Sequence, residues 1–319
     1  MAVKRRVRER GRGGHLSAVR ALVRSARRNL VWMALAALPA VGAAAGELRV
    51  QALDLLILPS RMDGGQALRE VSGLAWDAPS SHLLAVSDRG WLMRWRLDME
   101  RGRLRGVRQE GQWRLAFPDR VDAESVDVAV KGSKRSVLVL DEKRQRVVEI
   151  DDKGALIGTA ALPTSPKGGE PGTRADEDRF EAIAFHSDHG LLAIRQRPTA
   201  GLHRIHAQDG RQWAFRALDD ARSSIRGMHL VDAERLLVLE RTSIDGQRNA
   251  YLREIDLSRC AAAQLCNPAG APIRHPALRT DENFEGLACI DASLCLVASD
   301  DGDLDVPRTV LMLLRLDRD

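Results

Sequence analysis

The stretch ENFEGLACIDASLCLVASDD, residues 282–301, contains two short apolar runs joined by a turn and bracketed by carboxylates. Glu285 stands before the first run, and Asp300 and Asp301 follow the second. Apolar runs of this length, bounded by turn residues, are typical of buried β-strands. The stretch therefore predicts a β-hairpin with acidic side chains at its open end.

The same arrangement occurs five times in the chain. Each copy has a polar residue, an apolar run, a turn, a second apolar run and a final polar residue. The copies are EVSGLAWDAPSSHLLAVSD (70–88), ESVDVAVKGSKRSVLVLDE (124–142), EAIAFHSDHGLLAIRQ (181–196), RGMHLVDAERLLVLER (226–241) and EGLACIDASLCLVASD (285–300). Their starts are 45 to 59 residues apart, and repeats of this length made of short strands are typical of β-propeller blades.

Further strand-like segments between the copies bring each blade to about four strands. Only TVLMLLRLD (309–317) follows the last copy, so that blade needs another strand. The segment LRVQALDLLILP (48–59) could supply it and leave the ring without an open edge. We therefore expect an all-β protein with a single β-propeller of four-stranded blades, closed by its N- and C-terminal strands. The count favours five blades, or six if one copy has diverged beyond recognition.

Blade geometry predicts that the bracketing residues meet at one mouth of a central channel. The first strand of a blade lines the channel and the second runs antiparallel beside it, so the start of one and the end of the other share a face. The expected first circle is Glu70, Glu124, Glu181, Arg226 and Glu285. The expected second circle is Asp88, Glu142, Gln196, Arg241 and Asp300.

Carboxylates gathered in this way need compensation. Like charges in proximity raise one another's pKa or attract a cation, and Ca²⁺ prefers a cage of oxygen ligands. We therefore expect a divalent cation, Ca²⁺ before others, at the channel mouth. The structural alternative is that the acids cap strands and pair with Arg195, Arg226 and Arg241.

Several of these motifs resemble those of a known family. EVSGLAW with LLAVSDRG, DAESVDV, RFEAIAF, and NFEGLACID with LVASDD are similar to motifs of the phytase-like domain family, also labelled "esterase-like activity of phytase". The resemblance covers nearly all of residues 50–319 and implies an exported bacterial β-propeller that hydrolyses esters or phosphate esters. It also implies an acidic site made of Glu70, Asp88, Glu124, Glu181 and Glu285. The chain departs from the pattern in its fourth copy, where Arg226 and Arg241 stand in place of acids.

A hydrolytic mechanism can be written with these residues. A bound cation would polarise an ester or phosphoryl oxygen and lower the pKa of bound water. Glu124 is the candidate general base, and Arg226 and Arg241, with Glu142, are expected to hold an anionic substrate. The expected cation ligands are Glu70, Asp88, Glu181, Glu285 and Asp300. The alternative is a non-catalytic propeller of the cell envelope that binds a protein or a small ligand at the same rim.

The charge of the chain is unevenly distributed. Residues 1–45 hold ten lysines and arginines but one acid, Glu9, whereas residues 46–319 carry a net charge of −4. A nucleic-acid-binding protein needs a basic folded surface, so we expect no nucleic-acid partner. Aromatic residues make up 4% of the chain, which also argues against stacking on bases or sugars.

Residues 1–45 have the features of an export signal. A basic segment ending in SARRNL precedes an uncharged stretch at 30–45, and VGAAAG (41–46) offers small residues for cleavage. The uncharged stretch is short for a membrane span, which needs about 20 residues. We expect a leader at 1–45, a propeller domain at 46–319, and a periplasmic or secreted protein with no stable membrane span after cleavage. An uncleaved, membrane-anchored form is the alternative.

The four cysteines lie in two C-x5-C pairs, at 260 and 266 and at 289 and 295. In an exported protein such pairs predict two local disulfides, although three pairings of Cys260, Cys266, Cys289 and Cys295 exist. A bond between Cys289 and Cys295 would staple a hairpin. Zinc is the rival interpretation, but its usual spacing is C-x2-C.

Overall fold

The computed structural model is all-β in the part of the chain that it describes. The described residues are 47–62, 67–117, 121–163, 179–260, 265–302 and 308–318. The predicted leader at 1–45 lies outside them. Within these ranges there is no helix, and so none that could cross a membrane.

Five antiparallel sheets form the blades of a β-propeller, which confirms the predicted fold and blade count. The strands nearest the channel are β2 (Val71–Asp77), β6 (Ala123–Lys131), β10 (Phe180–His186), β14 (Ser223–Leu230) and β19 (Asn283–Cys289). The second strands are β3 (His82–Ser87), β7 (Lys134–Asp141), β11 (Gly190–Arg195), β15 (Arg235–Ile244) and β20 (Leu294–Asp300). The third strands are β4 (Trp91–Glu100), β8 (Arg146–Ile150), β12 (Leu202–Ala207), β16 (Gln247–Asp256) and β21 (Thr309–Arg318). The fourth strands are β5 (Arg103–Arg114), β9 (Leu156–Ala160), β13 (Gln212–Arg216), β18 (Ala269–Pro272) and β1 (Leu48–Leu58).

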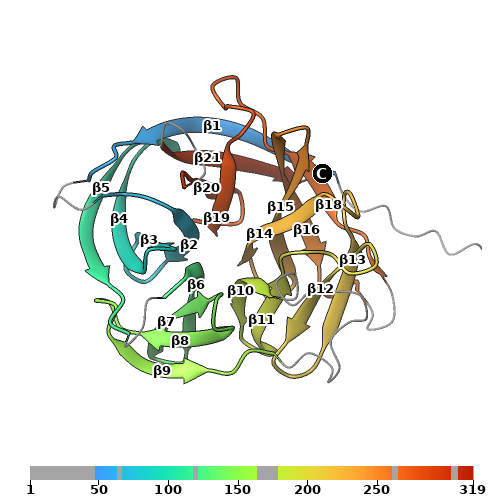
Figure 1. The fold of residues 1–319 in the computed structure, drawn as a ribbon, viewed down its shortest axis with the longest axis horizontal. Coiled ribbons are helices and arrows are strands. Elements are labelled where there is room, and N and C mark those ends of the chain that lie inside the picture. The colour runs from blue at the N-terminus through green and yellow to red at the C-terminus, as the bar shows by residue number, and fades with distance from the viewer. Residues whose placement is uncertain are drawn as a thin grey trace, which may run out of the picture. The chain divides into compact units, whose positions relative to one another are not determined.

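The ring closes on itself. Each innermost strand contacts the innermost strands of the two neighbouring blades, β19 and β2 included, as Figure 1 shows. The fifth blade takes its outer strand from the N-terminal end of the domain, where β1 pairs antiparallel with β21 from Leu48–Arg318 to Leu58–Thr309. This is the closure predicted from the sequence.

The third blade carries one strand beyond the expected four. The short strand β17 (Leu265–Cys266) pairs in parallel with the outer edge of β13. Its register joins Ala214 to Leu265 and Phe215 to Cys266. The segment that follows the fourth blade's third strand therefore reaches back to the third blade.

The hydrophobic core is divided into five clusters, one between each pair of neighbouring blades. The second strands bury both of their faces, so alternate residues serve different clusters. In β15, Leu236 and Val238 pack toward the third blade, whereas Leu237 and Leu239 pack toward the fifth. A strand buried on both faces is a continuous apolar run, which explains the unbroken apolar segments of the repeat.

Small residues allow the innermost strands to approach closely. A Cβ atom added at Gly227 would lie 2.8 Å from the carbonyl oxygen of Glu285, and one at Gly286 would lie 2.6 Å from Leu74 Cγ. No real side chain tolerates such contacts, so glycine is required at both positions. The resulting narrow ring brings the ends of the innermost strands together.

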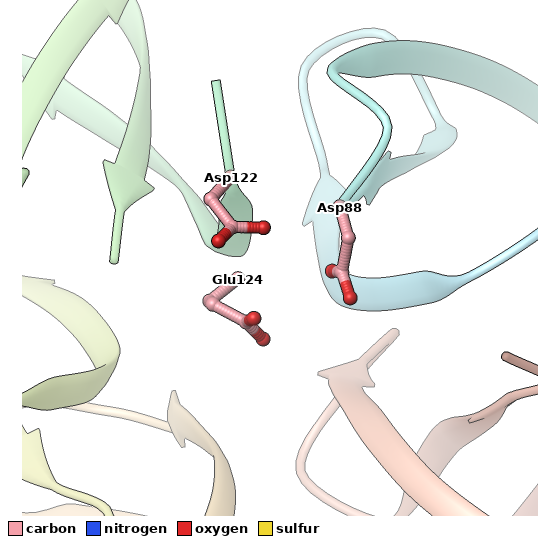
Figure 2. A group of neighbouring side chains, drawn as sticks. All are labelled: Asp88, Asp122 and Glu124. Atoms are coloured by element: carbon pink, nitrogen blue, oxygen red, sulfur yellow. The ribbon is translucent and has the colours of Figure 1, made fainter. Parts of the chain in front are cut away.

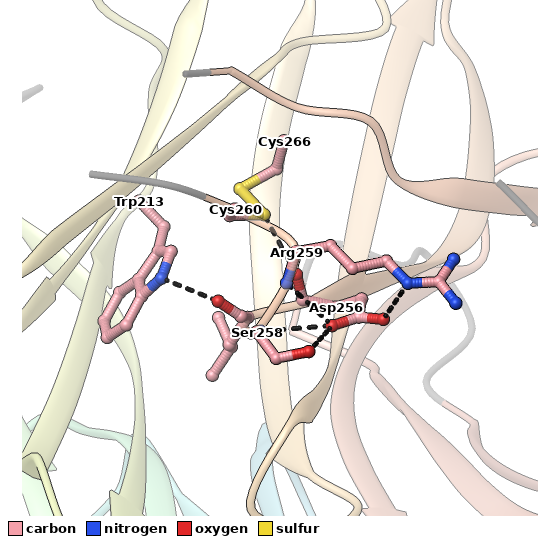
Figure 3. The surroundings of a disulfide bond; sticks show 7 residues. Trp213, Asp256, Ser258, Arg259, Cys260 and Cys266 are labelled. Carbon is pink, nitrogen blue, oxygen red and sulfur yellow. Dashed lines mark hydrogen bonds and ion pairs between the residues drawn. A yellow bond between two sulfur atoms is a disulfide. The ribbon is translucent and has the colours of Figure 1, made fainter. Parts of the chain in front are cut away.

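Both predicted disulfides are present. Cys289 and Cys295 face each other across the β19–β20 hairpin. The bond between Cys260 and Cys266 ties the segment after β16 to β17, and thereby joins the fourth blade to the third. Figure 3 shows this region, in which the Trp213 indole of β13 also donates a hydrogen bond to the Leu257 carbonyl oxygen at 3.3 Å. Structural disulfides of this kind are typical of proteins in oxidising compartments.

Candidate functional site: the channel mouth

A β-bulge interrupts the pairing of the first and second strands at the same place in every blade. The register shifts where one residue of the innermost strand has no opposite partner. The bulge residues are Ser72, Glu124, Glu181, Arg226 and Glu285. A bulge re-aims its side chain and is often found next to active sites, so the fold directs these five side chains in a common way.

The bulges correct the predicted alignment of the first blade. Glu70 was expected to match Glu124 and the other bulge residues, but Ser72 occupies that position. Glu70 lies two residues earlier, and its equivalents are Asp122, Arg179, Ser224 and Asn283. The predicted alignment of the first copy was wrong by two residues, because Glu70 stands two residues before the bulge position and was matched to the glutamates of the other copies. The residue after the bulge is small in every blade, and aligning on it would have revealed both Ser72 and the overlooked Asp122.

The second circle has the predicted register. The backbone N–H groups of Asp88 and Glu142 donate to the carbonyl oxygens of Glu70 and Asp122, at 3.2 and 2.9 Å. Gln196 bonds Arg179 in the same way at 3.2 Å. Arg241 is opposite Ser224, and Asp300 is opposite Asn283. All five residues therefore lie beside the bulges at one end of the blades.

Three carboxylates of the first two blades converge (Figure 2). Asp88 lies at the end of the first blade's second strand, and Asp122 and Glu124 lie at the start of β6. One oxygen from each carboxylate lies within 4.8 Å of the others. Ser72 donates its hydroxyl hydrogen to Asp88. Among the described residues, neither Asp88 nor Glu124 forms an ion pair with an arginine or lysine.

These carboxyl groups resist ionisation in the absence of a cation. Burial, followed by the charges of Glu285, Asp300 and Asp122, raises the pKa of Asp88 to about 8 against the lowering effect of Ser72. Burial and the neighbouring acids, Glu181 first, raise the pKa of Glu124 well above its usual value. A bound divalent cation would reverse this preference.

Arg226 neutralises the opposite side of the mouth. Its Nη1 lies 2.8 Å from Glu181 Oε1 and 2.9 Å from Glu285 Oε1. Burial opposes the charged form of the guanidinium, but these glutamates raise the net pKa of Arg226. Burial raises the pKa of Glu285 to about 7, although Arg226 acts to lower it. Two predicted cation ligands thus share an arginine as their counter-ion.

Amide side chains also donate hydrogen bonds to three acids of this side, Glu181, Glu285 and Asp300. Gln196 donates to both oxygens of Glu181, at 3.1 and 3.0 Å. Asn283 donates to Glu285 at 2.9 Å and to Asp300 at 3.1 Å. These bonds fix the orientation of carboxylates that would otherwise repel one another.

Arg241 is the cation of the rim that has no carboxylate partner. The residue is 8% exposed, and its Nε has no hydrogen-bond acceptor among the described residues. Burial, followed by the charge of Arg226, lowers its pKa to about 9. A buried guanidinium without a partner is costly, so an anion that reached Arg241 would be bound favourably.

The last two predicted residues lie at the margin of the mouth. Glu142 pairs with Arg179 at 3.6 Å, and burial raises its pKa. The Glu70 carboxylate forms an ion pair with Arg89, with 2.6 Å between Oε1 and Nη2, and the Glu70 backbone N–H donates to Asp301 Oδ1 at 2.8 Å. The φ angle of Glu70 is 55°, a strained value for a non-glycine residue. The backbone is therefore held in an unusual conformation next to Asp88.

The donor set at Asp88, Asp122 and Glu124 fits a hard divalent cation. It supplies carboxylate oxygens only, and Ca²⁺ and Mg²⁺ are bound in proteins by oxygen ligands of this kind. At the second side, Arg226 already supplies positive charge to Glu181 and Glu285. The mouth therefore has one side that carries only acids, at Asp88, Asp122 and Glu124, and another side where Arg226 and Arg241 lie among the acids.

Comparison with known proteins agrees with the family expected from the motifs. The family model described as "Phytase-like: Esterase-like activity of phytase" matches residues 66–303. No curated protein matches the chain. Among solved structures, the chain is similar to the RRP9 WD40 repeats at 13% identity and a TM-score of 0.42, with 79% of each chain covered. It is also similar to the Neurospora crassa Pan2 WD40 domain at 9% identity and a TM-score of 0.42, covering 83% of this chain and 95% of that one.

Proposed function

This chain belongs to the phytase-like family, and we propose that it is an exported, cation-dependent hydrolase of phosphate or carboxylic esters. The observation that carries the proposal is the convergence of Asp88, Asp122 and Glu124 at the same channel mouth as Arg241, which has no carboxylate partner among the described residues. A site that hydrolyses an anionic ester needs both a place for a cation and a place for the substrate's negative charge.

Asp88, Asp122 and Glu124 are the proposed cation ligands. This set differs from the one expected from the sequence, because Glu181 and Glu285 are occupied by Arg226 and Asp300 is held by Asn283. When bound, the cation would polarise the ester oxygen and lower the pKa of a coordinated water. Ca²⁺ is the first candidate, since it accepts irregular sets of carboxylate oxygens.

The arginines have different roles in this proposal. Arg241 binds the negative charge of the substrate, since no carboxylate in the described part of the chain competes for its guanidinium. Arg226 positions Glu181 and Glu285 and prevents their repulsion. Glu142, paired with Arg179, lies just after the second strand of its blade at the same channel mouth. The substrate is thereby oriented with its anionic part toward the fourth blade.

The role of general base, which the sequence analysis gives to Glu124, is part of this proposal. A single variant tests it. Glu124 is the bulge residue of the second blade at the channel mouth, and it can act as the base only if the cation leaves its carboxylate uncoordinated. If Glu124→Gln keeps Ca²⁺ affinity but loses hydrolysis, Glu124 is the base. If Ca²⁺ affinity falls as well, Glu124 is a ligand.

The proposed location is the bacterial periplasm or the exterior. The two disulfides support an oxidising compartment, and the basic and apolar pattern of residues 1–45 supports export. The proposed partner is a small anionic or ester substrate, and an envelope protein is the alternative.

The decisive experiment measures hydrolysis of p-nitrophenyl phosphate and p-nitrophenyl acetate with Ca²⁺, with Mg²⁺ and with a chelator. We expect activity that the chelator removes and that Asp122→Asn reduces by roughly a hundredfold or more. Asp188→Asn, an exposed acid in the β10–β11 turn at the other end of its blade, is the matched control and should retain activity. Cation binding without hydrolysis of any ester would instead support the non-catalytic envelope propeller.

A further inference from the structure

A cavity of about 170 Å³ lies between the first and second blades, away from the channel mouth. It is bounded by the β2–β3 turn, which is at the other end of the blade from the bulge residue Ser72. The apolar strand residues that line it are Leu84, Leu92 and Val137, and the charged residues are Asp77, Arg94, Arg135 and Asp152.

Three of these four charged residues are paired with one another. Arg135 donates from Nε to Asp77 Oδ1 at 2.8 Å and from Nη2 to Asp77 Oδ2 at 2.6 Å. Its Nη1 bonds Asp152, and the Ser80 hydroxyl also donates to Asp77. All three nitrogens of the Arg135 guanidinium are therefore engaged by the acids of the cavity wall.

Arg94 is the fourth charged residue, and it has no acceptor. Its guanidinium carbon lies 5.1 Å from the centroid of the Trp113 ring, and its Nε is buried without a hydrogen-bond partner. No carboxylate in the described part of the chain pairs with it. A cation–π contact holds a guanidinium over a ring but leaves its N–H groups unsatisfied. An oxygen ligand that entered the cavity would therefore be bound favourably by Arg94.

Positive charge is also in excess beside the cavity. Arg96 lies two residues further along β4, on the same side of the sheet as Arg94. Arg96 and Arg108 share one carboxylate, that of Glu110, at 2.5 and 3.7 Å. His82 contacts the same carboxylate at 2.6 Å. The cavity and its edge thus hold four arginines against three carboxylates, and a ligand with a single negative charge would balance them.

We propose that this cavity binds a small monocarboxylate, with its carboxylate on Arg94 and its apolar part against the apolar walls. The forked donors of a guanidinium match a carboxylate. The volume is close to that of a cavity of about 150 Å³ that holds benzene, so a ligand the size of benzoate fits. A second negative charge on the ligand would be repelled by Asp77 and Asp152. The site is separate from the channel mouth and does not depend on the proposed hydrolysis.

Calorimetry with benzoate and the full chain, in the presence of a chelator, tests the assignment. Arg94→Met keeps an apolar stem over Trp113 but removes the charge, and it should weaken binding roughly tenfold. The matched control is Arg114→Met, because Arg114 lies over Trp91 at 5.5 Å in the same strand pair but does not line the cavity. Its affinity should stay within about twofold of wild type. Equal affinities of the two variants would overturn the site.

A second variant tests the same site without touching Arg94. Asp152 has a side chain that is 60% exposed, so Asp152→Asn should leave the fold intact. It removes a negative charge from the cavity wall and should tighten benzoate binding about threefold. Unchanged or weaker binding would contradict the proposed position of the carboxylate. Loss of binding in Arg241→Met but not in Arg94→Met would assign benzoate to the channel mouth and overturn the inference.

Two further ligands test the chemical class. Benzamide has the shape of benzoate without its charge and should bind at least roughly tenfold more weakly. Inorganic phosphate, mostly a dianion above neutral pH, should also bind more weakly than benzoate. Equal binding of benzamide would contradict the ionic contact, and tighter, Arg94-dependent binding of phosphate would contradict the monocarboxylate class.

Discussion

The Nη1 atom of Arg226 lies 2.8 Å from Oε1 of Glu181, so the bulge residues of two neighbouring blades form a buried ion pair. The same nitrogen bonds Glu285 of the fifth blade. One arginine therefore joins three blades at the channel mouth. Its removal tests whether this contact holds the mouth together.

We expect Arg226→Met to lower the free energy of unfolding by about 3–5 kcal/mol, since two buried carboxylates lose their counter-ion. Urea denaturation at neutral pH measures this loss. The further changes Glu181→Gln and Glu285→Gln should restore much of the stability, because they remove the charges left unpaired. The control is Arg216→Met, which removes an exposed arginine at the end of β13. An Arg226→Met variant as stable as this control would contradict the bridging role.

Asp122→Asn should have opposite effects with and without a cation. Without a cation, the substitution removes a negative charge that raises the pKa of Asp88, so the melting temperature should rise. With Ca²⁺, wild type should gain stability by mass action, about 2.7 kcal/mol at a hundred times Kd, and the variant should gain far less. Melting curves at several Ca²⁺ concentrations measure both effects. Equal responses of wild type and variant would remove Asp122 from the cation site.

The stability of the cation-free protein should depend on pH through Asp88. Folding raises the pKa of this carboxyl from 3.8 to about 8, so the folded protein binds the proton more tightly than the unfolded chain. The free energy of unfolding should therefore fall as pH rises between these two values. Glu285, with a pKa of about 7, contributes with the same sign. Denaturation in a chelator should show a shallower fall for Asp88→Asn, and an unchanged slope would contradict this assignment.

The Cys289–Cys295 disulfide should stabilise the fifth blade. It closes a short loop across the β19–β20 hairpin, and chain-entropy estimates for such a loop are about 2 kcal/mol. We expect Cys289→Ala with Cys295→Ala to lower the free energy of unfolding by this amount in urea. The difference from wild type should shrink when both proteins are measured in dithiothreitol. A difference that persists in full under reduction would assign the loss to packing instead.

Removal of β1 should prevent the propeller from folding. A chain that begins at residue 59 lacks the strand that pairs with β21 and covers Val310, Met312 and Leu314 in the core between blades. A chain that begins at residue 47 retains it and should fold. Circular dichroism and size-exclusion chromatography distinguish the two, and a synthetic peptide of residues 47–59 should rescue the shorter chain. A native-like shorter chain would show that the closure is dispensable.

The repeat predicted the fold because strand spacing and burial are local properties of the sequence. Five copies with two apolar runs each favoured a count of five blades, although six stayed open, and the unpaired terminal runs indicated the closure. The site was less predictable, because its contacts cross between blades. The bond from Arg226 to Glu181 depends on how closely the innermost strands approach, which glycines such as Gly227 decide. The sequence offered the pairing of rim acids with Arg226 as the structural alternative, but it did not show that Glu181 and Glu285 are the partners.

One further residue, Asp122, was not found from the repeat. Asp122 was overlooked because Glu70 was aligned with Glu124. The positions of the bulges show that Glu70 corresponds to Asp122 instead. Such positions become interpretable only when the neighbouring strands are located in space.

The pairing of β1 with β21 also determines when folding of the propeller can be completed. Gln51 and Arg315, whose side chains are joined at 2.7 Å, are separated by 264 positions along the chain. The strand β1 cannot pair until β21 has been synthesised, and contacts between such distant segments form slowly. The ring can therefore close only after the whole propeller domain has been made, whichever of the other blades has formed before.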